Sequence, residues 1–202
     1  MNQQTIERLP SGFVYEAMVA GIKKSGKLDL TLIATTGPAV AAGVYTQNLV
    51  HATSIDWCRA RTPSDQIRAI VINSGNANAC TGVEGEANNR RLAELAGIHV
   101  GCQAEQVLVL STGVIGRQLP MPTIEAAWQR FPTLSAHEEA YLRAADGITT
   151  TDNRRKVATG TFTHAGRTYS VANMAKGAGM IGPNMATMLA IVTTDFPLSP
   201  SL

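Results

Sequence analysis

Thr187 is the residue of this chain whose setting most suggests chemistry. It follows a run rich in glycine and other small residues, 174–186, and precedes an apolar, strand-like run at 188–192. Glycine reaches backbone angles closed to other residues and Pro183 fixes one φ, so this loop can hold the Ala186 carbonyl close to the Thr187 hydroxyl. A threonine held in this way can attack the peptide bond on its own N-terminal side. A plainer interpretation, a Gly/Pro turn before a buried strand, stays open.

Cleavage between Ala186 and Thr187 would also supply the base that a threonine hydroxyl needs. The new α-amino group of Thr187 has an ordinary pKa of about 7.7–8.0, so it can accept the hydroxyl proton near neutral pH. Threonine with its own N-terminal amine is a known variant of the catalytic triad. The pattern therefore predicts a self-cleaving precursor with an N-terminal threonine nucleophile.

Three other segments carry groups that acyl chemistry can use. Ser111-Thr112-Gly113 follows an apolar strand at 107–110 and offers a hydroxyl and a glycine N–H to a developing oxyanion, although it also fits a strand-end turn. Lys176 could hold a substrate carboxylate or lower the pKa of the new amine, or it could be a solvated loop lysine. Thr149-Thr150-Thr151-Asp152 could clamp a substrate, although capping and turn formation are commoner uses of such residues.

Composition excludes several other classes of protein. The 202 residues carry a net charge of +2 and only 16% charged side chains, which argues against a nucleic-acid-binding surface. No apolar run reaches the length of a membrane span, and no signal-peptide core is present at the N-terminus. Three scattered cysteines indicate reduced thiols in a cytoplasmic protein, and four scattered histidines give no metal-site signal.

Strand and helix patterns alternate along the chain and predict an α/β (α+β) fold. Predicted strands are 28–34, 41–46 (after a Thr-Gly-Pro turn), 67–72, 107–110 and a hairpin of 157–163 with 167–172; predicted helices are 84–95, 122–128 and 138–145. The loop at 73–82 is rich in Asn, Ser and Gly. Capping boxes are predicted at Thr81/Glu84 and at Ser135/Glu138, with Gly97 as a helix stop. The sequence ends soon after the strand that follows Thr187, so we expect it to be half of a larger unit.

Taken in order, these segments resemble the ornithine acetyltransferase family of arginine biosynthesis, the bifunctional glutamate N-acetyltransferase/ornithine acetyltransferases. The resemblance runs from about Gly12 to Asp195. It is carried by 174–189, with the family's cleavage pair Ala186–Thr187, by 73–82, by 111–116 and by 150–152. It implies a layered sandwich with inner β-sheets and outer helices, of which most of the second half is absent here. Residues 1–186 would correspond to the family's α chain and 187–202 to the start of its β chain.

The resemblance also implies roles for individual residues. Thr187 would be the nucleophile for self-cleavage and for acetyl transfer, with Thr112 and Gly113 as the oxyanion hole. Thr150 and Lys176 would contact substrate together with Thr187, although the neighbouring threonines leave the register at Thr150 open. The reaction would be ping-pong, from N-acetylornithine to glutamate, with acetyl-CoA as a donor in some members and no bound cofactor. The full-length family forms α/β heterotetramers.

Two departures from the family pattern leave alternatives open. Residues 152–156 read Asp-Asn-Arg-Arg-Lys where the family usually has Thr-Asp-Thr before a Pro-Lys pair, which affects the loop near the substrate. Family precursors are also about twice as long. The alternatives to the transferase are an N-terminal-nucleophile amidase or aminopeptidase, in which water accepts the acyl group, and an inactive truncated fragment or interaction subunit.

Overall fold

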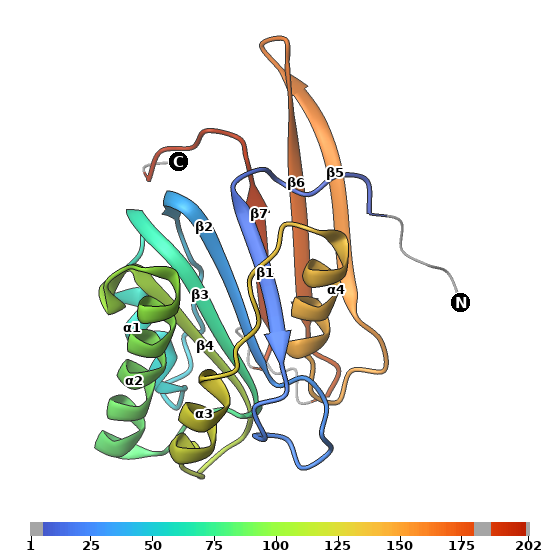
Figure 1. Ribbon diagram of the computed structural model, residues 1–202. Helices are drawn as coiled ribbons and strands as arrows, with labels where there is room; N and C mark the ends of the chain where they lie inside the picture. Colours follow the sequence, from blue (N-terminus) through green and yellow to red (C-terminus); the bar gives the residue numbers. More distant parts are fainter. Residues whose placement is uncertain (1–5, 180–186, 201–202) are drawn as a thin grey trace.

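The computed structural model describes residues 6–179 and 187–200, which form two β-sheets and four α-helices (Figure 1). The strands are β1 (Phe13–Met18), β2 (Leu30–Ala41), β3 (Ser64–Asn76), β4 (Val107–Val114), β5 (Lys156–His164), β6 (Arg167–Lys176) and β7 (Leu189–Thr194); the helices are α1 (Thr53–Arg59), α2 (Gly82–Val100), α3 (Met121–Trp128) and α4 (Glu138–Gly147), with a 3-10 turn at Ala104–Gln106. The predicted mixed α/β class is confirmed. No helix in these ranges is long and apolar enough to cross a membrane.

The two sheets differ in their strand pairing. The first has the order β1-β2-β3-β4, antiparallel except for the parallel pair β3–β4, which is connected through α2. The second has the order β5-β6-β7 and is antiparallel throughout. The predicted hairpin is β5–β6, and β7, which follows Thr187, is the third strand of that sheet. Because β3 and β4 are parallel, their carboxyl ends lie at the same edge.

Side chains alternate along the first sheet and bury its two faces in different cores. On β2, Leu32 and Ala34 pack with residues of α2 and α3, whereas Ile33 packs with α4 and with residues of the second sheet. The Tyr15 hydroxyl lies 3.2 Å from the Thr193 hydroxyl on β7, which joins the two sheets directly. The result is a layered sandwich with α2 and α3 outside the first sheet and the second sheet on its other side, as Figure 1 shows.

Part of the strand prediction is wrong. β2 continues past residue 34 to Ala41, so the predicted Thr-Gly-Pro turn is absent, and residues 42–51 form no strand. The pairing of β2 with β3 shifts register twice after Ala34. Pro38 lies within the first of these irregular stretches, between Ala34 and Ala39, where a residue without an N–H is tolerated because the hydrogen-bond ladder is already interrupted.

The predicted ends of two helices also need correction. α2 continues past Gly97 to Val100. A Cβ added at Gly97 would lie 2.7 Å from the Cys102 carbonyl oxygen, so glycine is needed there for space. The helix ends at Gly101, which has φ +75° and donates its N–H to Gly97 O. Neither predicted capping box forms: the Thr81 hydroxyl donates to Asn78 Oδ1 instead, and α4 begins after His137 without a side-chain cap.

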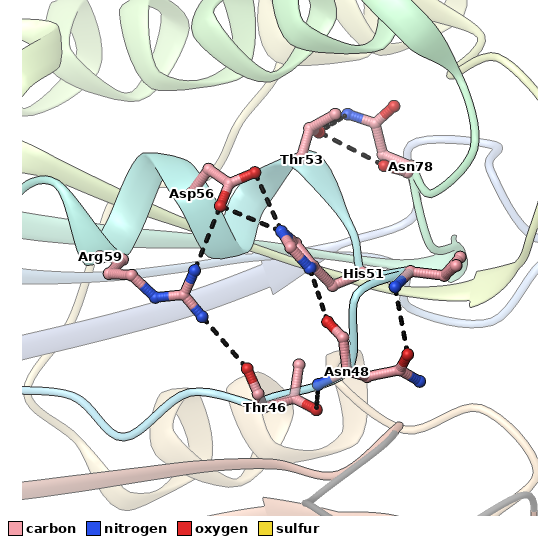
Figure 2. Close-up of polar contacts among 8 residues, drawn as sticks. Thr46, Asn48, His51, Thr53, Asp56, Arg59 and Asn78 are labelled. Carbon is pink, nitrogen blue, oxygen red and sulfur yellow. Dashed lines mark hydrogen bonds and ion pairs between the residues drawn. The ribbon is translucent and has the colours of Figure 1, made fainter.

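β1 and α1 are not among the predicted elements. β1 has Glu16 in an otherwise apolar run, and this carboxylate is buried where Arg143 of α4 donates to it at 2.8 Å. α1 has seven residues, too few for a helical repeat to be recognised. Figure 2 shows how α1 is tied to the preceding segment: His51 contacts the Asn48 carbonyl through Nδ1 (2.8 Å) and the Asp56 carboxylate through Nε2 (3.0 Å).

Stability should depend on pH through His51. The pKa of His51 is raised, first by the Asn48 carbonyl and then by Asp56, because only the doubly protonated ring can donate to both acceptors. Its contribution is therefore full below the unfolded pKa, about 6.5, and is lost as pH rises through the raised folded value. We expect His51→Gln to lower the free energy of unfolding by no more than about 1 kcal/mol at pH 5.5 and by less at pH 9, measured by urea denaturation. A wild-type-minus-variant difference that stays constant over this range would contradict the assignment.

Candidate active site

Five segments that are distant in the sequence meet at one edge of the molecule. β3, β4 and β6 end there, and the loops 19–29 and 148–155 lie at the same edge, at the bottom of Figure 1. The residues that the sequence singled out at 111–113, 149–152, 176 and 187 all belong to these segments or adjoin them. This edge is therefore the candidate active site.

A close approach of two glycines fixes the ends of β3 and β4. Gly75 pairs with Gly113, which has φ +138°. A Cβ atom added at Gly113 would overlap the carbonyl carbon of Gly75 and the amide of Asn76. Only glycine fits there. Ser111-Thr112-Gly113 thus lies within β4, near its carboxyl end, and does not form the turn that was its alternative interpretation.

The end of β3 and the loop after it are held by amide side chains. β3 extends to Asn76, so the predicted loop 73–82 begins later than expected. The Ser111 hydroxyl donates to Asn73 Oδ1 (2.6 Å), and Asn73 Nδ2 donates to the Asn76 carbonyl (2.8 Å). Asn78 takes up a left-handed conformation and donates from Nδ2 to Gly85 O at the start of α2 (2.8 Å). These residues are buried and bonded to one another, so the 73–82 segment supports the edge.

Lys176 connects two of the predicted site residues. It is the last residue of β6 and only 3% exposed, so it is not a solvated loop lysine. Its Nζ donates to Thr112 Oγ1 at 2.8 Å and to the backbone carbonyl of Thr187 at 3.1 Å. Burial lowers the pKa of Lys176, the nearby charge of Asp152 raises it in part, and Lys156 lowers it further.

Thr187 itself has an unusual backbone. Its φ is +64°, a left-handed value that costs a β-branched residue roughly 1–3 kcal/mol. Its hydroxyl donates to the carbonyl of Gly179 at 3.4 Å. Strain of this kind concentrates at functional positions. Ala186, the other half of the predicted cleavage pair, lies outside the described residues.

Asp152 fastens the 148–155 segment to the end of β6. Its side chain is fully buried, and it accepts hydrogen bonds from Gly177 N (2.9 Å), Thr150 N (3.3 Å) and Lys156. Burial alone would raise the pKa of Asp152, but these donors outweigh it and the pKa is lowered. The Thr149 hydroxyl donates to a carbonyl of α4 (2.7 Å), so it closes the helix end and leaves Thr150 as the threonine tied to Asp152. No hydrogen bond described in this structure joins Thr150 directly to Lys176 or Thr187.

The loop 19–29 also contributes to this edge, although no site residue was predicted in it. Asp29, placed there in a predicted strand, is completely buried and accepts backbone N–H groups from Ala20, Ile22 and Lys23 at 2.6–2.8 Å. A carboxylate at the start of an apolar run, preceded by Gly21 and Gly26, was the available signal. No cluster of three or more His, Cys, Asp or Glu that could bind a metal occurs in the residues described.

The model of the ArgJ family matches residues 14–202. The chain belongs to the ArgJ family. It is 46% identical to the arginine biosynthesis bifunctional protein ArgJ of Rhodopirellula baltica over 193 residues, and 46% identical to that of Geobacter sulfurreducens over 191. These alignments cover 95% and 94% of this chain but 47% and 48% of the relatives, so the chain spans about half the length of the curated relatives it matches.

Two solved structures of ArgJ-type proteins share the fold. A chain of the Bacillus halodurans ArgJ protein superposes with a TM-score of 0.82 at 33% identity, covering 88% of this chain and 92% of that one. A chain of the ornithine acetyltransferase of Mycobacterium tuberculosis, complexed with ornithine, gives 0.78 at 36% identity, covering 88% and 94%. The resemblance found in the sequence and the fold it implied are therefore confirmed.

Because of the close approach at Gly113, we expect alanine to destabilise this ArgJ-family chain more at position 113 than at a glycine with open space around it. Gly113→Ala should lower the free energy of unfolding by about 3 kcal/mol or more, because the new Cβ overlaps backbone and the φ is strained. Gly116→Ala is the matched control: its φ is +76° but nothing lies within 4 Å of a Cβ there, so it should cost about 1 kcal/mol. Equal losses of the two variants in urea denaturation would show that the Gly75–Gly113 approach is looser than described.

The charge of Lys176 should depend on Asp152. Because Asp152 raises the pKa of Lys176, Asp152→Asn should lower that pKa further while keeping an oxygen acceptor for Gly177. An NMR titration of the Lys176 side-chain amine measures this. Asp146→Asn serves as the control, since Asp146 is paired with Arg155 at the same edge (2.9 and 2.5 Å). A Lys176 titration unchanged in Asp152→Asn, or changed equally in both variants, would refute the coupling.

Proposed function

We propose that this protein transfers an acetyl group from N2-acetylornithine to glutamate, with Thr187 carrying the group as an ester. The observation that supports this best is the position of Lys176, whose Nζ donates both to Thr112 Oγ1 (2.8 Å) and to the Thr187 carbonyl (3.1 Å). One buried cation thereby holds the proposed nucleophile and the proposed oxyanion-binding residue at fixed positions.

The same contact determines which way the Thr112 hydroxyl donates. A lysine ammonium has donors only, so Thr112 Oγ1 must accept from it, and the hydroxyl proton is left for another acceptor. We assign that proton, with the N–H of Gly113, to the oxyanion that forms when an acyl carbonyl is attacked. Lys176 acts here as a positioning residue and as a nearby positive charge.

Self-cleavage would prepare the nucleophile. Thr187 Oγ attacks the Ala186 carbonyl carbon, the bond from that carbon to the Thr187 nitrogen breaks, and an ester to Oγ replaces the peptide bond. Water then hydrolyses the ester, leaving a carboxylate on Ala186 and an α-amino group on Thr187. The charge of Lys176 near this amine favours its neutral form, which can serve as a base.

Acetyl transfer follows in two balanced halves. The Thr187 α-amine takes the hydroxyl proton while Oγ attacks the acetyl carbonyl; the C–N bond breaks and ornithine leaves with the proton on its amine. The α-amine of glutamate then attacks the ester carbonyl, the C–O bond breaks, and the Thr187 hydroxyl recovers a proton. Thr150 and Lys176 are proposed to contact the amino-acid substrates.

The comparisons support this proposal from another side. The Mycobacterium tuberculosis relative is named an ornithine acetyltransferase and was solved with ornithine, and the curated relatives are named as bifunctional proteins of arginine biosynthesis. The reaction needs no bound cofactor, and acetyl-CoA is a second donor to test. We further propose α/β heterotetramers as the assembly, residues 1–186 and 187 onward as its two kinds of chain, and the cytoplasm as the place of work.

The main alternative is an amidase that uses the same nucleophile and lets water take the acetyl group. The two functions differ in a single readout, the dependence of product on glutamate. In the protein expressed from its complete gene, the proposed function predicts N-acetylglutamate in step with ornithine. Acetate released at the same rate with or without glutamate would instead establish the amidase.

Replacement of Thr187 should stop both reactions. Thr187→Ala removes the hydroxyl, so intact-mass analysis should show an uncleaved chain, and acetyl transfer should fall by more than about 10³-fold. Thr161→Ala, an exposed threonine on β5, is the control and should cleave and react as the wild type does. Cleavage at 186–187 in Thr187→Ala, or an unprocessed but fully active wild type, would overturn the mechanism.

A further inference from the structure

Lys23 lies beside the glycine pair of the proposed site. It belongs to the loop 19–29, at the edge where β3, β4 and β6 end (Figure 1). A Cβ added at Gly75 would lie 2.9 Å from Lys23 Cγ, so the lysine stem covers the open face of Gly75. Gly75 also pairs with Gly113 on β4, and a Cβ added at Gly113 would overlap the Gly75 backbone. The stem of Lys23 thus contacts the residue that pairs with Gly113 of the proposed oxyanion site.

The loop holds Lys23 in a defined place. The buried carboxylate of Asp29 accepts the backbone N–H of Lys23 at 2.8 Å and that of Ile22 at 2.7 Å. The Lys23 Nζ donates to the Leu28 carbonyl at 2.6 Å. An ammonium has three protons, so two remain for further acceptors. These bonds restrict the position of the Lys23 side chain but leave two of its hydrogen-bond donors for other acceptors.

Lys23 forms no ion pair in the part of the chain that the structure describes, unlike two other cations at the same edge. Arg155 and Lys156 at this edge each pair with a carboxylate, Asp146 and Asp152. The Nζ of Lys23 bonds only a carbonyl oxygen among the contacts described. Partial burial is the main cause that lowers the pKa of Lys23. The charge of Asp29 raises this pKa, those of Lys27 and Lys176 lower it, and that of Asp146 raises it. Two half-buried or buried cations that repel one another are the arrangement that a bound anion stabilises.

We propose that Lys23 binds the side-chain carboxylate of the acceptor amino acid. This inference rests on the proposed function. Donor and acceptor share the α-carboxylate, and only glutamate carries a second one. Lys176 contacts both Thr112 and Thr187, so it lies nearest the reacting atoms and takes the α-carboxylate. Lys23, beyond Gly75, takes the group at the far end of the side chain and so selects a dicarboxylic acceptor.

A comparison of glutamate with glutamine tests this directly, because the two have nearly the same shape and differ only in whether the side chain ends in a carboxylate or in a neutral amide. The protein expressed from its complete gene is titrated with each by calorimetry, and their ratio of kcat/KM as acceptors is measured. Lys23→Met keeps the stem that covers Gly75 and should reduce the preference for glutamate over glutamine by at least about tenfold, which corresponds to about 1.4 kcal/mol. Lys23→Arg should restore much of it. Lys24→Met, at an exposed neighbouring position, should leave the ratio within about twofold.

The results separate this inference from the proposed function. A wild type that binds glutamate no better than glutamine, or a Lys23→Met variant that keeps the wild-type ratio, overturns the role of Lys23. The same follows if Lys24→Met loses as much preference. The proposed function is judged independently, by whether N-acetylglutamate forms at all. A protein in which glutamate binds in a Lys23-dependent way but water accepts the acetyl group would uphold the inference and contradict the transferase.

Discussion

The site depends on one buried ammonium group. Lys176 donates to Thr112 and to the carbonyl of Thr187, residues that belong to different sheets or adjoin them. Burying an ammonium is expensive unless it is hydrogen-bonded and partly neutralised. Here the two oxygen acceptors supply the bonds and Asp152 supplies the opposite charge. Because each compensating group comes from a separate segment, those segments must meet for Lys176 to be tolerated.

The rest of the edge is built to permit this meeting. The parallel pair β3–β4 brings two carboxyl ends together, and Gly75 and Gly113 let them approach more closely than any side chain would allow. The Tyr15–Thr193 contact joins the two sheets, and the core shared by α4 and the second sheet fixes the position of β6 relative to the first sheet. Asp152 then draws Thr150 toward the end of β6. Packing of the strands and helices therefore positions the strand ends, and the polar contacts of Lys176 and Asp152 determine how the side chains there are arranged.

Local sequence patterns predicted much of this and failed at identifiable places. The strand β3 and the hairpin β5–β6 were found because a short apolar run and a glycine turn between two strand-like runs are signals that lie next to one another in the sequence. The strand at 41–46 was wrong because Thr-Gly-Pro is typical of a turn, whereas here β2 continues past it and resumes its pairing with β3 at Ala39. Glu16 concealed β1, since its partner Arg143 is 127 residues away. Lys23 and Asp29 were missed for a similar reason: loop geometry and burial are not visible in residue type.

The grouping of Lys176, Thr112 and Thr187 was anticipated only through the resemblance to a family. Nothing in the spacing of residues 112, 176 and 187 states that one amine touches the other two. A double-mutant cycle measures that contact most directly. In the protein expressed from its complete gene, the rate of acetyl transfer is compared for Lys176→Met, Thr112→Val and the double variant. If Lys176 orients Thr112, the double variant should react about as slowly as Lys176→Met alone, a coupling of roughly 0.5–3 kcal/mol. Losses that simply multiply would contradict the account.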